Sequence, residues 1–225
     1  MGVLSRIERR EKMKVQMTKL TLCRSLETIL TALFLIVLFG CMTVTDKQTI
    51  VESSNSNLTF GGNKIAVLPV DTQKSLTTDS AMSLRRDINK RLGPTLQKKL
   101  PAAKIIDVAI VTDQLNKKKV LAIYEQLLST YENIGVIDIQ KANVLGRALG
   151  SGYLLLSRLK SEKMDMIIMR SFGASLELMI VGADTGKIYW GGTGDWKRGG
   201  IFGAGKASSE EVAESMVNLA FESLK

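Results

Sequence analysis

The sequence predicts an α/β fold: a single domain in which one mixed β-sheet packs against helices, in the order strand, helix, strand, helix, helix, three strands, helix (βαβααβββα). Two observations predict it. An early apolar run is continuous, as in a strand buried on both faces, whereas later segments alternate or recur at helical spacing. Of the 225 residues, 185 follow a compositionally distinct N-terminal segment, which is enough for one domain with a proper core.

The first half of the domain is expected to hold two strands and three helices. In chain order these are a strand over 64–70, a helix over 78–100, a strand over 104–108, and helices over 112–131 and 139–149. Gly93 and Pro94 can bend or end the first helix early. Gly150 suits the left-handed residue that follows a helix, so it marks the end of the third helix.

The second half is expected to hold three strands and a helix. These are strands over 153–159, 174–183 and 187–191, and a final helix that Ser208 or Ser209 caps. Asp184–Thr185–Gly186 is a tight-turn signal, so the second and third of these strands form a hairpin. The many glycines between 191 and 205 predict a loose stretch before the final helix.

Charge and composition exclude several classes of function. Lys and Arg number 31 against 22 Asp and Glu, but residues 1–40 hold seven of the former and three of the latter, which leaves about +5 on the rest. This is too modest to predict nucleic-acid binding. Histidine is absent and cysteine occurs only at Cys23 and Cys41, so zinc sites of Cys and His and catalysis by Ser-His-Asp or Cys-His are excluded. We therefore expect no metal and no cofactor.

The N-terminal segment has the pattern of a secretion signal. An apolar run of 11 residues, Ile29–Phe39, follows a basic region. A membrane-spanning helix needs about 20 such residues, whereas the apolar part of a signal peptide needs about 7–15. Met13 or Met17 are alternative start sites to Met1. An uncleaved signal anchor, or a buried helix with a core cysteine, is the alternative interpretation.

The run ends in Leu38–Phe39–Gly40–Cys41, which resembles the lipobox of bacterial lipoproteins, although Phe39 departs from the small or β-branched residue usual there. The resemblance implies cleavage between Gly40 and Cys41 and acylation of Cys41, including palmitate-type chains. Stable anchoring requires two or more such chains. Met42 is not the Asp that favours inner-membrane retention in enteric-type bacteria, so the resemblance favours the outer membrane, facing the periplasm.

The expected organisation follows from this signal. Residues 1–40 form a lipoprotein signal peptide, 41–62 a lipidated cysteine with a flexible linker rich in Ser, Asn and Gly, and 63–225 the α/β domain.

Three segments carry candidate chemistry, each with a simpler interpretation. Gly200–Ala207 nearly matches a phosphate-binding loop, but Ala207 stands where the metal-binding hydroxyl is required and too little chain follows. Asp71 follows the first strand, where α/β folds often place a functional carboxylate, although a turn or cap is commoner. Lys117–Lys119 is most simply a solvated helix face, and contact with anionic headgroups or glycan is the alternative.

Two further segments are candidates for contacts with a partner. Tyr189, Trp190 and Trp196 can stack on a partner, although core packing is the commoner role of such residues in a domain with few aromatics. Lys163–Arg170, with several large apolar residues, is either an oligomer or membrane contact or a simple extension of its strands.

From Lys64 onward the pattern resembles a group of small periplasmic lipoprotein domains. The group comprises the curli-secretion-channel lipoproteins, the lipoprotein activators of peptidoglycan synthases and the N-terminal domain of the Tol-system propeller protein. The segments that carry the resemblance are Lys64–Val70, Ala148–Leu156 and Leu176–Trp190. It implies a non-enzymatic role in assembling, recruiting or activating envelope machinery.

The expected function is therefore a membrane-anchored, non-enzymatic scaffold or binding subunit in cell-envelope assembly or secretion. Its expected partners are the membrane and envelope proteins, with self-association left open. One alternative is an oligomeric curli-type secretion channel, for which residues 160–173 offer one weak hairpin where that family uses two. The other is a carboxylate-dependent envelope hydrolase, for which substitution of Asp71 and Glu177 is the discriminating test.

Overall fold

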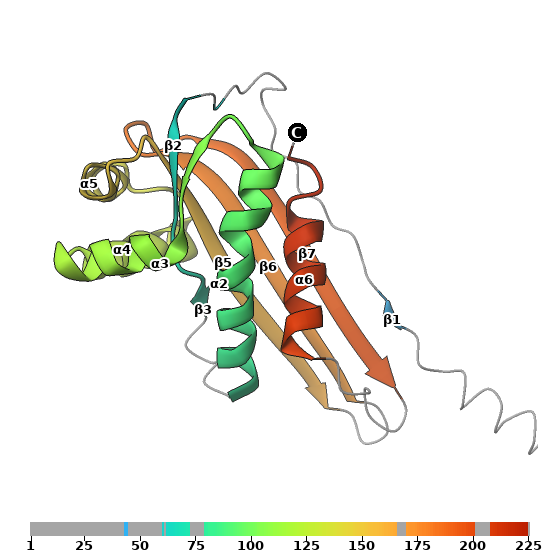
Figure 1. Cartoon of the computed structure of the whole chain (residues 1–225). Coiled ribbons are helices and arrows are strands. Elements are labelled where there is room, and N and C mark those ends of the chain that lie inside the picture. Colours follow the sequence, from blue (N-terminus) through green and yellow to red (C-terminus); the bar gives the residue numbers. More distant parts are fainter. Residues whose placement is uncertain are drawn as a thin grey trace, which may run out of the picture.

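A computed structural model describes residues 43–44, 60, 62–72, 79–165, 170–200 and 208–224. Its centre is one mixed sheet with the strand order β1-β7-β6-β5-β2-β4, and β3 also pairs with β5 (Figure 1). The strands β2, β4 and β5 are parallel to one another, whereas β5, β6 and β7 form an antiparallel meander. The predicted fold class, a single mixed sheet packed with helices, is confirmed.

The strands and helices alternate early in the chain and separate later. The strands are β1 (Thr43–Val44), β2 (Lys64–Val67), β3 (Asp71–Thr72), β4 (Lys104–Ile106), β5 (Tyr153–Asp165), β6 (Arg170–Gly182) and β7 (Ile188–Gly200). The helices are α2 (Asp79–Lys99), α3 (Val108–Lys117), α4 (Leu121–Ile134), α5 (Ile139–Leu149) and α6 (Ser209–Ala220).

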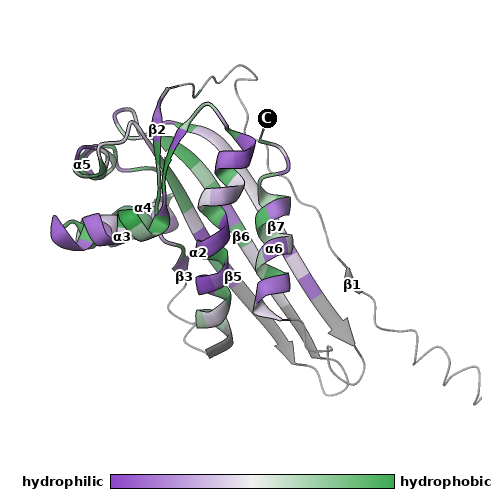
Figure 2. Ribbon diagram, viewed as in Figure 1, coloured by the Kyte–Doolittle hydropathy of each residue, from purple (hydrophilic) through white to green (hydrophobic). Residues whose placement is uncertain are grey.

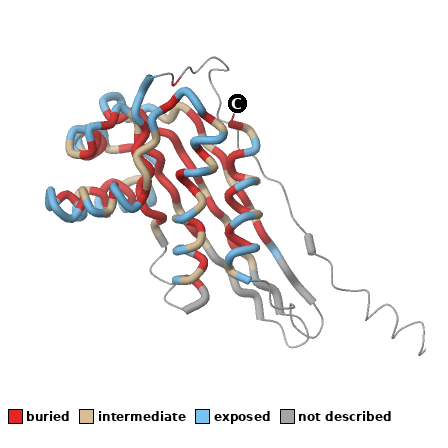
Figure 3. Tube along the Cα trace, viewed as in Figure 1, coloured by how far each residue is buried: buried red, intermediate tan, exposed pale blue. Residues whose placement is uncertain are grey.

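The sheet carries a separate hydrophobic core on each face. Helices α2 and α6 lie side by side across one face, over alternate residues of the strands such as Ile65, Leu155 and Leu178 (Figures 1 and 3). Helices α3, α4 and α5 cover the other face, over the intervening residues such as Leu154 and Val181. Alternate strand residues point to opposite faces, so β2, covered on both sides, is apolar without interruption, as its continuous run predicted.

Two glycines of β7 set how closely α6 approaches the sheet. A Cβ on Gly192 would lie 2.1 Å from the backbone oxygen of Ala220, and one on Gly194 would lie 2.0 Å from that of Met216. The helix backbone therefore occupies the space that side chains would fill. The expectation of a loose stretch is wrong for residues 191–200. This segment belongs to strand β7, and two of its glycines allow α6 to pack closely.

The predicted helix over 112–131 is two helices, which is a second correction. The chain breaks between α3 and α4, and Lys119 adopts a left-handed backbone with φ 56°. The buried residues Leu115 and Val120 are five positions apart, so the apolar spacing of one continuous helix fails at this point. The second strand is also shorter than expected, since Asp107 already caps α3, its carboxylate accepting a hydrogen bond from the N–H of Ala109 (3.0 Å).

Several local signals are confirmed. Gly150 ends α5 with φ 63°, and Gly186 takes φ 64° in the turn between β6 and β7. Ser208 caps α6, its hydroxyl accepting a hydrogen bond from the N–H of Glu211 (3.1 Å). Helix α2 passes through Gly93 and Pro94 without ending.

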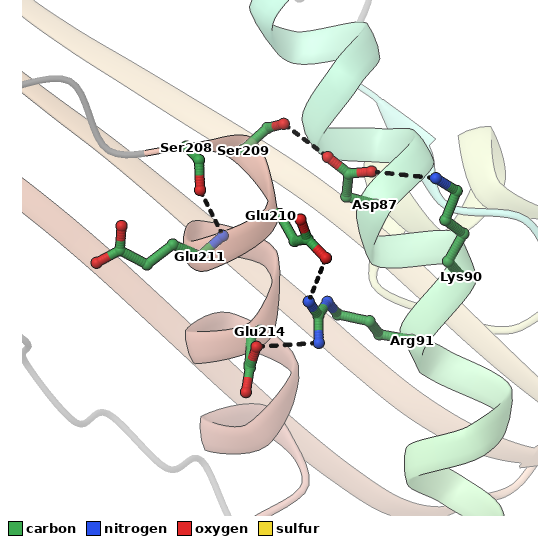
Figure 4. A network of polar contacts seen from close by, with 8 residues as sticks. All are labelled: Asp87, Lys90, Arg91, Ser208, Ser209, Glu210, Glu211 and Glu214. Carbon is green, nitrogen blue, oxygen red and sulfur yellow. Dashed lines mark hydrogen bonds and ion pairs between the residues drawn. The ribbon is translucent and has the colours of Figure 1, made fainter.

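Polar contacts join α2 to α6 above their shared core (Figure 4). The guanidinium of Arg91 lies 3.2 Å from a carboxylate oxygen of Glu210 and 3.1 Å from one of Glu214. The hydroxyl of Ser209 donates a hydrogen bond to Asp87 (2.6 Å). Hydrophilic residues recur along both helices, whereas β5 and β6 carry long hydrophobic segments (Figure 2). These contacts link α2 and α6 at their solvent-facing side.

Acid is expected to weaken the start of α5. The carboxylate of Asp138 accepts a hydrogen bond from the N–H of Lys141 (3.1 Å) and pairs with its ammonium, which lowers the pKa of Asp138 below its ordinary value. Its stabilisation is present above the unfolded-state pKa and is lost as the pH falls through the lower folded-state pKa. We expect urea unfolding to show a smaller stability loss between about pH 5 and pH 3 for Asp138→Asn, which keeps the cap, than for the wild type. Equal losses would contradict this role.

Candidate functional site on the open face of the sheet

Part of one face of the meander carries polar side chains and is not covered by any helix that the structure describes. Helices α3–α5 pack over one end of this face, near Leu154, Leu156 and Val181. Beyond them the same face, which we call the open face, continues with polar residues of β5, β6 and β7, because every second residue of a strand points to it. These residues are Arg158, Lys160, Ser175, Glu177, Thr193, Asp195 and Lys197. An antiparallel sheet commonly leaves one such face to solvent.

A row of alternating charges crosses the open face. Arg158 is the register partner of Asp71 in β3 and of Glu177 in β6, so the two acidic residues lie on either side of it. Arg158 also forms an ion pair with Glu132 of α4, and the ammonium of Lys160 lies 2.6 Å from a carboxylate oxygen of Glu177. The structure thus brings together the two carboxylates that the sequence singled out, with cations beside them.

A shallow hollow lies farther along the open face. Its lining comprises Lys160, Gly173, Ala174, Ser175, Asp195 and Lys197. Gly173 has no side chain to fill the space, and charges of both signs surround it. Such a mixture of charges is typical of the polar part of a binding surface, where the charge pattern sets orientation and specificity.

The two predicted tryptophan contacts lie in the core. Trp190 is 4% exposed, stacks on Phe221 with ring centroids 5.5 Å apart, and donates a hydrogen bond from Nε1 to Ser223 (3.3 Å). Trp196 is also buried. Core packing, the interpretation favoured from the sequence, accounts for both. Tyr189 is half-buried against Tyr153, with ring centroids 5.4 Å apart.

The other sequence candidates are dispersed. Lys117–Lys119 is exposed, with Lys117 paired to Asp113 at 2.7 Å, as expected of a solvated helix end. Lys163 and Arg170 belong to β5 and β6, so the two ends of this segment extend the strands, as one of its two interpretations expected, and residues 166–169 lie outside the described residues. Gly40, Cys41 and residues 201–207 of the predicted loop lie outside the described residues.

One surface feature was missed by the sequence reasoning. Ile134, Val136 and Ile139 are 66%, 59% and 52% exposed, close together in the chain at the junction of α4 and α5. We call these three residues the junction cluster. They lie outside the periodic apolar positions that are buried in α4 and α5. This was the one signal in the sequence that could have indicated their exposure. Exposed aliphatic groups this close together in the chain make the junction cluster a candidate interaction surface.

Neither a metal cluster nor a membrane-spanning helix is found in the part of the chain that the structure describes. No group of three or more Asp, Glu, Cys or His residues there could hold a metal ion. None of the described helices combines the length and apolar character needed to cross a membrane.

Comparison with known proteins gives structural similarity only. No family model matches the chain, and no curated protein matches it by sequence. A PelC dodecamer from Paraburkholderia phytofirmans is 14% identical with a TM-score of 0.44, covering 79% of this chain and 96% of that one. The lipoprotein GNA1162 from Neisseria meningitidis is 13% identical with a TM-score of 0.39, covering 61% of this chain and 83% of that one.

A third similar structure is the LpoB C-terminal domain from Escherichia coli, 16% identical with a TM-score of 0.33, covering 63% of this chain and 86% of that one. One of these neighbours is named as a lipoprotein. At this similarity no residue role passes from them to this chain.

Proposed function

We propose that the chain is a bacterial lipoprotein, anchored by lipid on Cys41, whose domain is a non-enzymatic scaffold or binding subunit in cell-envelope assembly or secretion. The anchor is supported by the apolar run and the Leu38–Cys41 motif. The proposed location is the outer membrane, with the domain in the periplasm.

The junction cluster is the observation that carries the binding role. Each fully buried aliphatic side chain stabilises a contact by about 1.5–3 kcal/mol relative to exposure, so three exposed together are a source of binding free energy. On the open face, by contrast, Arg158 and Lys160 already form ion pairs within the fold, with Glu132 and Glu177 respectively. A cluster of apolar side chains that are more than half exposed suits recognition of a protein surface.

The proposed function is tested by crosslinking in the native envelope followed by purification of the chain. The wild type is expected to capture the same envelope proteins in repeated experiments, and Ile134→Ser with Val136→Ser is expected to lose them. The matched control is Met82→Ser, which removes a similarly exposed apolar group from α2, at 51% exposure. Capture that survives the double substitution would contradict a role for the cluster.

The rival interpretation, a wall or glycan hydrolase, makes an opposite prediction for the two carboxylates. As a scaffold, the Asp71→Asn and Glu177→Gln variants are expected to release no less product from purified peptidoglycan than the wild type, because neither carboxylate acts in a reaction. Release of soluble fragments by the wild type, abolished in both variants while their circular dichroism is unchanged, would overturn the scaffold proposal in favour of carboxylate catalysis.

A further inference from the structure

Strand β1 brings the N-terminal part of the chain to the outer edge of β7. The two strands pair antiparallel, with Thr43 opposite Arg198 and Val44 opposite Lys197 (Figure 1). Cys41 precedes Thr43 by two residues, and two residues of chain span at most about 7 Å. A lipid on Cys41 would therefore hold the membrane surface close to this end of β7.

The hollow of the open face lies at the same end of the meander. Lys197, the register partner of Val44, is one of its lining residues, and Lys160, Ser175 and Asp195 form the neighbouring row across β5, β6 and β7. The hollow has a volume of about 220 Å³. Pockets for drug-sized ligands measure about 300–1,000 Å³, so this one suits a smaller polar group.

The hollow offers one side-chain charge of each sign with no partner among the residues that the structure describes. The ammonium of Lys197 is exposed and the carboxylate of Asp195 is half-buried, and neither side chain makes a hydrogen bond or ion pair there. The ammonium of Lys160, by contrast, is held by Glu177. A complementary ligand therefore carries an anionic and a cationic group a short distance apart. The phosphoethanolamine headgroup, a phosphate diester joined to a primary ammonium by two carbons, has this chemistry.

We propose that the hollow binds the phosphoethanolamine headgroup of a phospholipid in the membrane to which the chain is anchored. Lys197 would pair with the phosphate and Asp195 with the ammonium, while the hydroxyl of Ser175 would donate to a phosphate oxygen. Each exposed ion pair is worth at most about 1 kcal/mol, so the headgroup alone binds weakly. The inference rests on the proposed lipid at Cys41, which raises the effective concentration of headgroups beside the hollow.

The contact would orient the domain on the membrane. The junction cluster lies toward the other end of the meander, because Ile139 sits against Gly186 in the turn before β7: a Cβ on Gly186 would lie 2.6 Å from its side chain. The stretch from Ile188 to Lys197 is ten residues long, which corresponds to about 30 Å of strand. Headgroup binding at Lys197 would thus turn the junction cluster away from the membrane, toward envelope proteins.

Lysine footprinting on the acylated full chain tests the proposal. The chain is reconstituted in vesicles of phosphatidylethanolamine with phosphatidylglycerol or kept in dodecyl maltoside, and acetylation by a water-soluble reagent is followed by peptide mass spectrometry. The acetylation rate of Lys197 is expected to fall at least about threefold in the vesicles, given the strength of exposed ion pairs. Lys98, exposed at the end of α2 over the opposite face, is the internal control and is expected to react equally in both.

The charge pattern is tested with Asp195→Asn and with phosphatidylcholine. The quaternary ammonium of phosphatidylcholine donates no N–H hydrogen bond to a carboxylate, so vesicles of this lipid are expected to protect Lys197 less. Asp195→Asn is expected to lose the preference for phosphatidylethanolamine while keeping its circular dichroism. Asp184→Asn, at an exposed position in the turn before β7, is the matched control and is expected to keep that preference.

Three results would overturn the headgroup site. They are equal reactivity of Lys197 in vesicles and detergent, equal protection of Lys98, and a lipid preference that survives Asp195→Asn. Full protection by inorganic phosphate in detergent would assign the hollow to a free anion and overturn the headgroup as its ligand.

A separate experiment distinguishes failure of the lipid anchor from failure of the hollow as a binding site. Should Cys41 carry no lipid, the hollow is tested on the detergent-extracted full chain by titration with glycerophosphoethanolamine, followed through the amide NMR signals of Ser175, Asp195 and Lys197. Shifts that saturate in the wild type and vanish in Lys197→Glu would support the hollow although the anchor had failed. Absence of shifts in the wild type would refute the hollow itself.

Discussion

Gly194→Ala is expected to destabilise the folded domain by about 3 kcal/mol, near the upper end for inserting a methyl group into a packed site. The new Cβ would lie 2.0 Å from the backbone oxygen of Met216, and a helix backbone cannot rotate away as a side chain can. Helix α6 must therefore shift from β7, which also disturbs the stack of Trp190 on Phe221. Gly192→Ala is expected to behave alike. The measurement is the urea midpoint by circular dichroism.

Gly191→Ala is the matched control. Gly191 lies in the same strand, but a Cβ there would approach no atom closer than the backbone oxygen of Leu178, at 3.8 Å, which is ordinary contact. We expect a change of less than about 1 kcal/mol, since alanine also restricts the unfolded chain. Similar destabilisation at Gly191 and Gly194 would show that the effect reports strand glycines in general and not the approach of α6.

Cys41→Ala is expected to abolish acylation completely. Thioether lipid requires the cysteine sulfur, and the chain offers only one other cysteine, Cys23. Cells labelled with an alkyne analogue of palmitate should give a labelled band for the wild type and for Cys23→Ala, and none for Cys41→Ala. The apolar run of 11 residues is shorter than the roughly 20 that span a bilayer, so the anchor depends on the lipid. Label retained in Cys41→Ala would contradict the site.

The elements that follow strong local rules were predictable. The continuous run of β2, the capping Ser208 and the left-handed Gly150 all have local causes, and each is confirmed. The hairpin of β6 and β7 followed from the turn at Asp184–Gly186 in the same way.

The errors have tertiary causes. Glycines in β7 indicated a loose stretch because sequence alone does not show that a helix backbone will pack onto them. The chain breaks at Lys119 and Val120 is buried in the core. The three lysines before Val120 give no sign of this in the sequence. The sequence favoured core packing for the two tryptophans, and their burial in the assembled fold confirms it.

The candidate site was only partly predictable. Asp71 and Glu177 were each singled out from the sequence, but their common neighbour Arg158 was not. The register between β3, β5 and β6 places the three together, and the sequence alone does not show this register. The junction cluster was missed because an aliphatic residue outside the periodic positions can be either buried by another element or left exposed. Burial decides between these meanings, and burial depends on the assembled fold.

Mass spectrometry of the N-terminal peptide from the native envelope tests the account most directly. The proposed lipoprotein should yield a mature chain whose first residue is Cys41, with a mass increased by a thioether-linked diacylglycerol and, where added, an amide-linked acyl chain. A mature chain that begins upstream of Cys41, or a Cys41 recovered as an unmodified thiol, would contradict the lipid anchor and with it the proposed attachment of this domain to the envelope.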